Sequence, residues 1–148
     1  TTTPIKDGFW SVKLLSEDLV PVGTDEQLFP DGKRGYTFIT TDVEARNFME
    51  DWKDYLGLIQ KTSLLDKAAV MGASHYSFAA EMALEGVGIA LVPYFLAEQR
   101  LLDGGLRIWH DTRLPTGRAY YLNVKHARRS EPSIRSFINW VRRSIAEG

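Results

Sequence analysis

The pattern of apolar and polar positions is clearest between residues 74 and 93. Residues 76–85 have strong helix propensity, and Ser74 ahead of them is a good N-cap. Gly86 suits the left-handed residue that follows many helix ends. The unbroken apolar run 89–92 is typical of a strand that is buried on both faces of an α/β sheet. The segment therefore predicts a helix, a turn and a buried strand in succession.

Strands and helices alternate along the rest of the chain. The other predicted strands span residues 9–15, 19–23, 36–40, 67–71, 106–109 and 119–124. We expect Pro21 to interrupt the second of these strands and residues 115–117 to form a turn. A short helix is expected at residues 94–102. This alternation predicts the α/β class.

Two more helices are indicated by capping residues and apolar spacing. Thr41 and Glu44 have the spacing of a capping box, and the apolar face after them runs until Gly57. Towards the C-terminal end, Ser130 can cap a helix and Pro132 suits its first turn. The apolar stripe of that helix consists of Ile134, Phe137, Ile138, Val141 and Ile145, with Arg135, Arg142 and Arg143 outside it. Both segments are therefore predicted as amphipathic helices.

Composition and charge narrow the class of protein. The 148 residues suffice for one ordinary domain or two small lobes, and 44% apolar with 25% charged residues indicates a folded, soluble protein. The net charge of -1 argues against a chain that itself grips nucleic acid. Cysteine is absent, which excludes disulfides and thiolate sites. No apolar run approaches the roughly 20 residues that span a bilayer, so a cytoplasmic protein without membrane contact is expected.

Several candidate chemical motifs have simpler structural interpretations. Gly86 and Gly88 follow a helix and precede a strand, the reverse of the order in a dinucleotide fingerprint, so we expect no nucleotide cofactor. His75, His110 and His126 lie far apart in the sequence, without the spacing of a metal site.

The start of the helix near residue 76 contains side chains that could serve in catalysis or in ligand binding. Ser74, His75 and Ser77 lack the Gly-x-Ser-x-Gly elbow of a nucleophilic serine, so capping and packing are favoured over catalysis. A helix start can nevertheless bind a ligand, because its exposed amides and the positive end of its dipole attract carboxylates.

A basic run precedes the last predicted helix, close to Tyr120 and Tyr121. It consists of Lys125, His126, Arg128 and Arg129. We favour a solvated patch over nucleic-acid contact, because no recognition-helix pattern accompanies the run.

Residues 79–93 (AAEMALEGVGIALVP), followed by residues 101–106 (LLDGGL), resemble LysR-type transcriptional regulators. Residues 10–24 are similar to the passage where the chain of that family leaves its first effector-binding lobe for the second. Residues 120–122 and 128–140 resemble the family's closing strand and helix. The resemblance covers nearly the whole chain, with its parts in the family's order.

The resemblance implies a periplasmic-binding-protein-like effector domain of type 2, in which a small-molecule site lies between two α/β lobes, each a mixed sheet flanked by helices. Residues 1–21 would end lobe I and cross over, residues 22–115 would form lobe II, and residues 116–148 would return to lobe I. The sequence lacks the winged helix-turn-helix that binds DNA and the first half of lobe I. It also begins with threonine. We therefore expect the intact protein to be longer, and to be a dimer or tetramer.

The resemblance also implies where an effector binds. The matching positions are Thr24, Ser74, His75 and Tyr76, with Thr40 and Thr41 as weaker candidates. Hydrogen bonds to a small anionic molecule are the expected role, with His75 as a pH-sensitive donor. Binding would change how the separate helix-turn-helix domain engages DNA, without catalysis, cofactor or metal. A solute-binding transport protein and an α/β enzyme using Ser74 and His75 are the alternatives.

Overall fold

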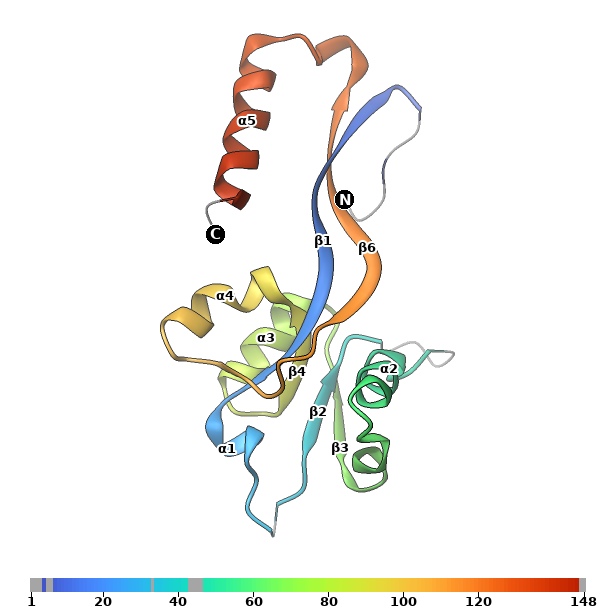
Figure 1. Cartoon of the computed structure of the whole chain (residues 1–148), viewed down its shortest axis with the longest axis vertical. Coiled ribbons are helices and arrows are strands. Elements are labelled where there is room, and N and C mark those ends of the chain that lie inside the picture. The colour runs from blue at the N-terminus through green and yellow to red at the C-terminus, as the bar shows by residue number, and fades with distance from the viewer. Residues whose placement is uncertain (1–3, 5–6, 33, 43–46, 147–148) are drawn as a thin grey trace. The chain divides into compact units, whose positions relative to one another are not determined.

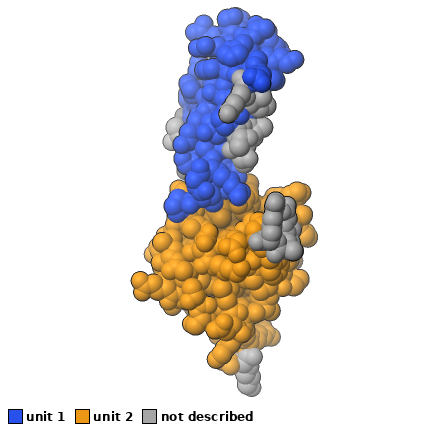
Figure 2. Space-filling view, turned by 90° about the vertical axis from the view of Figure 1, so that its right-hand side faces the viewer, with its two compact units in different colours: residues 1–17, 115–148 blue, residues 18–114 orange. Residues whose placement is uncertain are grey.

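The computed structural model of the protein describes residues 4, 7–32, 34–42 and 47–146. The chain forms two compact units (Figure 2). Unit 1 contains residues 1–17 and 115–148, and unit 2 contains residues 18–114.

Strands and helices alternate along the chain (Figure 1). The strands are β1 (Phe9–Gly23), β2 (Thr37–Thr40), β3 (Ala69–Gly72), β4 (Ile89–Pro93), β5 (Arg107–Ile108) and β6 (Leu114–Lys125). The helices are α1 (Asp25–Leu28), α2 (Glu50–Leu58), α3 (Tyr76–Leu84), α4 (Tyr94–Leu102) and α5 (Pro132–Ala146), with 3-10 turns at Thr62–Lys67 and His126–Arg128. The predicted α/β class is confirmed.

Unit 2 is built on a mixed sheet with the strand order β3-β2-β4-β1-β5. β2 runs parallel to β3 and β4, with Phe38 opposite Val70 on one side and Ile89 on the other. β1 runs antiparallel to β4 and β5, with Val22 opposite Ala90 in β4. The parallel strands β2, β3 and β4 therefore end at the same edge of the sheet, and the part of β1 in unit 2 ends at the opposite edge.

Helices cover both faces of this sheet, and neighbouring strand residues point to opposite faces (Figure 1). Ile39 and Val92 belong to one buried cluster, whereas Phe38 and Leu91 belong to another. The first cluster includes Ala79, Ala83 and Ala97 of α3 and α4, and the second includes Trp52, Tyr55 and Leu56 of α2. Because both faces are covered, every residue of β4 is buried. The unbroken apolar run had predicted such a strand.

The turn between α3 and β4 depends on two glycines. Gly86 has a φ of 74°, and the amide of Val87 donates to the carbonyl of Met82 at 3.0 Å, which is the long hydrogen bond of a Schellman motif. A Cβ atom on Gly88 would lie 2.6 Å from the carbonyl oxygen of Thr37. Gly88 thus allows β4 to approach β2. Both glycines have the structural roles that the sequence predicted.

Two strand predictions are wrong. β1 is one continuous strand of 15 residues. Pro21 does not interrupt it, because the fixed φ of proline is compatible with a strand and its carbonyl still accepts the amide of Trp109 at 2.9 Å. The predicted turn that ends at Gly117 lies inside β6, where Gly117 has a φ of 73° and the amide of Arg118 donates to Thr116 Oγ1 at 3.1 Å. The turn-forming residues therefore produce only a local irregularity within a long strand.

The start of α2 also differs from the prediction. The helix begins at Glu50 instead of following Thr41, whose amide donates to the carboxylate of Asp51 at 3.3 Å. Glu44, the second residue of the predicted capping box, lies outside the described residues. The helix continues one residue past Gly57, because a glycine near a helix end weakens the helix without breaking it.

Unit 1 combines the first part of β1 with β6 and α5. β6 pairs with β1, and Ser11 Oγ donates to Asn123 Oδ1 at 2.5 Å across the pair. The carboxylate of Glu17, which is buried, accepts the hydroxyl of Tyr120 at 2.6 Å. α5 begins at Pro132, whose fixed φ suits a first helical turn as predicted.

Candidate functional site

The strongest candidate site in unit 2 is the edge where β2, β3 and β4 end. Thr40 pairs with Gly72 in register, and β4 runs parallel to β2 with Ala90 opposite Ile39, so the three strands end side by side. α2, α3 and α4 follow the three strands in sequence, which places their N-termini at this carboxyl edge. In open α/β sheets, ligands bind outside the carboxyl ends of the strands. Helix N-termini add a positive potential there.

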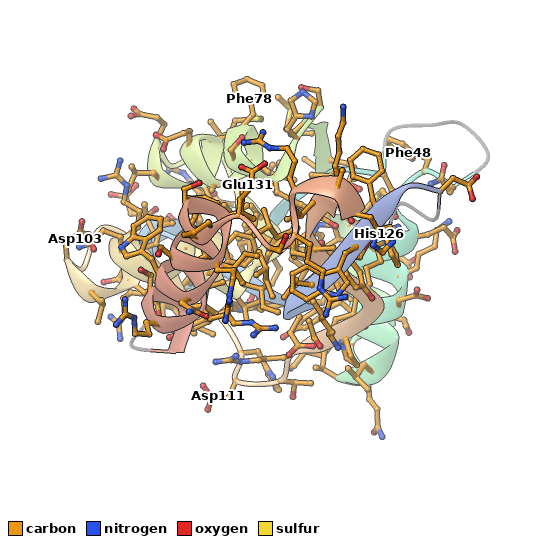
Figure 3. The ribbon with its side chains drawn as sticks, turned by 90° about the horizontal axis from the view of Figure 1, so that it is seen from above. Phe48, Phe78, Asp103, Asp111, His126 and Glu131 are labelled. Atoms are coloured by element: carbon orange, nitrogen blue, oxygen red, sulfur yellow. The ribbon has the colours of Figure 1, made fainter. Side chains whose placement is uncertain are left out.

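Ser74, His75 and Tyr76 lie between β3 and α3 at this carboxyl edge. Ser74 and His75 are exposed, and Tyr76 is half-buried against both core clusters. The N-cap is His75, in an extended conformation, and not Ser74 as predicted; no side chain caps the helix. First-turn amides lack carbonyl partners within a helix, so those of Ser77 and Phe78 can donate outwards. Phe78 is 54% exposed and points away from unit 2 (Figure 3).

Thr40 lies beneath the carboxyl edge, with its hydroxyl occupied inside the protein. It donates to Asp51 Oδ1 at 2.7 Å and accepts the amide of Asp42 at 3.1 Å. The residue is completely buried. Thr40 therefore cannot contact a ligand directly, in contrast to its predicted role, and holds the end of β2 instead. Thr41, the next residue, is half-buried.

Asp51 is the residue below the edge that the predictions missed. Its carboxylate accepts hydrogen bonds from Thr40 and from the amides of Thr41 and Trp52. Burial raises its pKa above the usual 3.8 and the nearby carboxylate of Asp42 adds to this rise, whereas the three hydrogen bonds oppose it. The sequence contains one signal for this role: Asp51 directly precedes Trp52, which belongs to the apolar stripe of α2.

A cation lies at the start of α4. Tyr94 follows Pro93 directly at the carboxyl edge, and the guanidinium carbon of Arg113 lies 4.1 Å from the centre of the Tyr94 ring. Arg113 is exposed, so its charge remains available to an anion. No pattern in the sequence indicates this pair, because Arg113 lies between two predicted elements, far from Tyr94 along the chain.

Thr24 lies apart from the other predicted site residues. It follows the end of β1, at the opposite edge of the sheet from Ser74. Its Oγ1 atom lies 3.9 Å from where a Cβ atom on Gly86 would be, and Gly86 follows the far end of α3. Because a strand rises about 3.3 Å per residue, the four-residue strand β2 separates the two edges by about 10 Å. One small ligand cannot contact Thr24 and Ser74 together.

The sequence matches one family model along almost its whole length, the LysR substrate binding domain, over residues 2–146. The chain belongs to the LysR substrate-binding domain family. No curated protein matches it. Its family resemblance, predicted from the sequence, is thus confirmed. The family is a ligand-binding domain of transcription regulators.

Solved structures share the fold of this LysR substrate-binding domain. The effector-binding domain of AmpR from Citrobacter freundii has a TM-score of 0.72 at 14% identity, covering 97% of this chain and 71% of that one. The AmpR effector domain of Pseudomonas aeruginosa has a TM-score of 0.67 at 18% identity, covering 96% and 67%. Full-length LysG from Corynebacterium glutamicum with bound effector Arg has a TM-score of 0.61 at 16% identity, covering 100% and 50%.

Within residues 7–32, 34–42 and 47–146, no three His, Cys, Asp or Glu side chains gather as a metal site would require. None of the helices there is both long and apolar enough to cross a bilayer.

Proposed function

We propose that this LysR substrate-binding domain binds a small anionic effector at the carboxyl edge of unit 2. The observation that carries the proposal is the uncapped N-terminus of α3, next to the exposed residues Ser74 and His75 and at the end of three parallel strands. Exposed first-turn amides and a helix dipole bind anions without further charge. Thr41, Tyr76 and Arg113 are proposed as flanking contacts.

Thr24 and Thr40 have different roles in the proposal. Thr24 lies at the other edge, and Thr40 supports the site from below through Asp51. His75 is proposed as a donor whose charge depends on pH. The LysG structure, which was determined with bound effector Arg, supports a small molecule as the effector.

The wider function is proposed from the family. Unit 2 would correspond to lobe II and unit 1 to the returning part of lobe I. Effector binding would change how a helix-turn-helix domain outside this sequence engages DNA, in a cytoplasmic dimer or tetramer. The chain itself would carry out no catalysis and need no cofactor.

The test substitutes the N-cap of α3. In His75→Asp, a carboxylate would accept the first-turn amides and repel an anionic ligand. We expect α3 to become more stable, by about 1 kcal/mol, while the affinity for a responsive organic acid or amino acid falls at least about tenfold. Thermal unfolding with a panel of such compounds identifies the responsive ligand, because a ligand of the native state raises the Tm.

Thr24→Asp is the matched control, because Thr24 is the N-cap of α1 and also makes no side-chain cap. It adds the same charge at the opposite edge and should leave the affinity unchanged. Equal losses in both variants, or a panel without any stabilising anion, would contradict the proposal.

A further inference from the structure

A cavity of about 500 Å³ lies within unit 1, and none of the six predicted effector residues lines it. Ile138, which is buried, and Trp10 provide its apolar part. Its polar part comes from His126, Arg129, Arg135, Asn139 and Arg142. The volume is in the range of small-molecule sites. The proposed function at the edge of unit 2 does not involve this cavity.

Two separate sequence features meet in the cavity. Arg129 belongs to the basic run before α5, whereas Arg135 and Arg142 belong to the helix. Ile138, Arg135 and Arg142 share one face of α5, because residues three, four and seven positions apart lie above one another. The sequence had suggested that the basic run is a solvated patch. In the structure, His126 and Arg129 of that run line one concave site together with a face of α5.

Three guanidinium groups concentrate positive charge at this cavity. Within the described part of the chain, no carboxylate pairs with Arg129, Arg135 or Arg142, and no acidic residue is among those lining the cavity. The guanidinium carbon of Arg129 lies 4.6 Å from the centre of the Trp10 ring, which holds the group in place without neutralising it.

Glu131, an acidic residue close to the basic run in the sequence, is paired with an arginine that does not line the cavity. Glu131, labelled with His126 in Figure 3, accepts two hydrogen bonds from Arg128 at 2.8 and 2.9 Å. This pairing lowers the pKa of Glu131, first through the hydrogen bonds and then through the charge of Arg128. Glu131 therefore remains ionised on Arg128, and the charge of the cavity stays positive.

We propose that this cavity binds a small polyanion with two or more carboxylate or phosphate groups, through Arg129, Arg135 and Arg142. Guanidinium groups bind such oxyanions in a bidentate manner. Three of them around one cavity match several oxyanion groups better than a single one, and the Trp10 ring and Ile138 can cover the carbon or bridging atoms of the ligand.

Isothermal titration of the 148-residue chain with citrate and with pyrophosphate tests this site, with acetate as the single-charge control. We expect one equivalent of at least one polyanion to bind, more weakly at higher salt, and acetate not to bind. Preference between citrate and pyrophosphate identifies carboxylate or phosphate as the ligand group. Arg135→Gln and Arg142→Gln should each weaken binding about tenfold or more.

Arg118→Gln is the matched control, because Arg118 is an exposed arginine of unit 1 that does not line the cavity. It should leave the affinity within about twofold of the original. Circular dichroism checks that the substituted chains remain folded. The proposal is overturned if neither polyanion binds, if Arg118→Gln weakens binding as much as Arg142→Gln, or if a short DNA duplex displaces pyrophosphate at a lower concentration than citrate does.

Discussion

At the scale of single residues, the carboxylate of Asp51 fixes the geometry of the candidate site. It lies on α2 but its hydrogen bonds reach the end of β2, so it joins two elements at the point where the carboxyl edge begins. Its burial makes the ionised form costly, and a buried charge is tolerated only when donors surround it. The hydrogen bond from the hydroxyl of Thr40 is the shortest of the three, at 2.7 Å.

Thr40→Val tests the importance of this donor. The variant keeps the side-chain shape but removes the hydroxyl donor from Asp51 Oδ1, which keeps only the amide of Trp52. Because a hydrogen bond to a charged group is lost, we expect a loss of about 1–3 kcal/mol in the free energy of unfolding near pH 7. The hydrogen bond from Thr40 opposes the raised pKa of Asp51, so its removal raises that pKa further. A raised carboxyl pKa contributes stability that is present below the unfolded value and lost as the pH rises through the folded pKa.

The loss in Thr40→Val should therefore be smallest below pH 3.8, where the carboxyl group is protonated in both states, and should grow towards neutral pH. Urea unfolding at several pH values measures it. Thr41→Val is the control, because Thr41 donates to Asp51 through its backbone amide. A loss that does not depend on pH would argue against a role through Asp51.

Residue patterns predicted part of the candidate site but not its arrangement. The segment from Ser74 to Tyr76 was predicted from the family resemblance and from a local signal, the start of a helix, and its role in binding stays a prediction. Thr24 was included in the same site through the family resemblance. Local propensities do not reveal the direction in which β1 crosses the sheet, so they could not separate Thr24 from Ser74. Arg113 was missed because its contact with Tyr94 depends on tertiary packing.

At the scale of elements, the best predictions concern segments whose signals are local and agree with one another. α4 has the predicted bounds, residues 94–102, and β4 starts and ends within one residue of its prediction. The predictions at Pro21 and Gly117 were wrong because the local preference and the tertiary structure disagree. Each residue favours a break when considered alone, but pairing with neighbouring strands outweighs that preference over a long strand.

Two glycine substitutions should have opposite effects on stability. In Gly88→Ala, the new Cβ atom would lie 2.6 Å from the carbonyl oxygen of Thr37, so β4 must move away from β2; we expect a loss of about 1–3 kcal/mol. In Gly57→Ala, no atom lies within 4 Å of the new Cβ atom. Since alanine favours a helix over glycine, we expect a gain of up to about 1 kcal/mol.

Thermal and urea unfolding of both glycine variants measure the difference. If Gly88→Ala is as stable as the original chain, then close approach of β2 and β4 does not require glycine at this position.

At the scale of the whole molecule, the buried apolar residues are concentrated in unit 2. Both buried clusters of the central sheet lie in unit 2, whose helices cover the two faces. Exposed apolar side chains occur in both units: Phe137 and Trp140 on α5 are 48% and 56% exposed, and Phe78 and Leu102 of unit 2 are 54% and 78% exposed. Exposed aromatic residues of this kind promote association. Most of the apolar burial that stabilises the folded chain therefore lies in unit 2.

A fragment of residues 18–114 should consequently fold by itself, because the clusters on both faces of its sheet remain complete. We expect a cooperative unfolding transition in urea. The fragment should retain the affinity for the effector identified with the His75→Asp test, since the proposed contacts lie in unit 2. It should bind neither citrate nor pyrophosphate through the arginine cavity, which unit 1 alone supplies. An unfolded fragment would show that the central sheet needs the remainder of β1 and β6 for its stability.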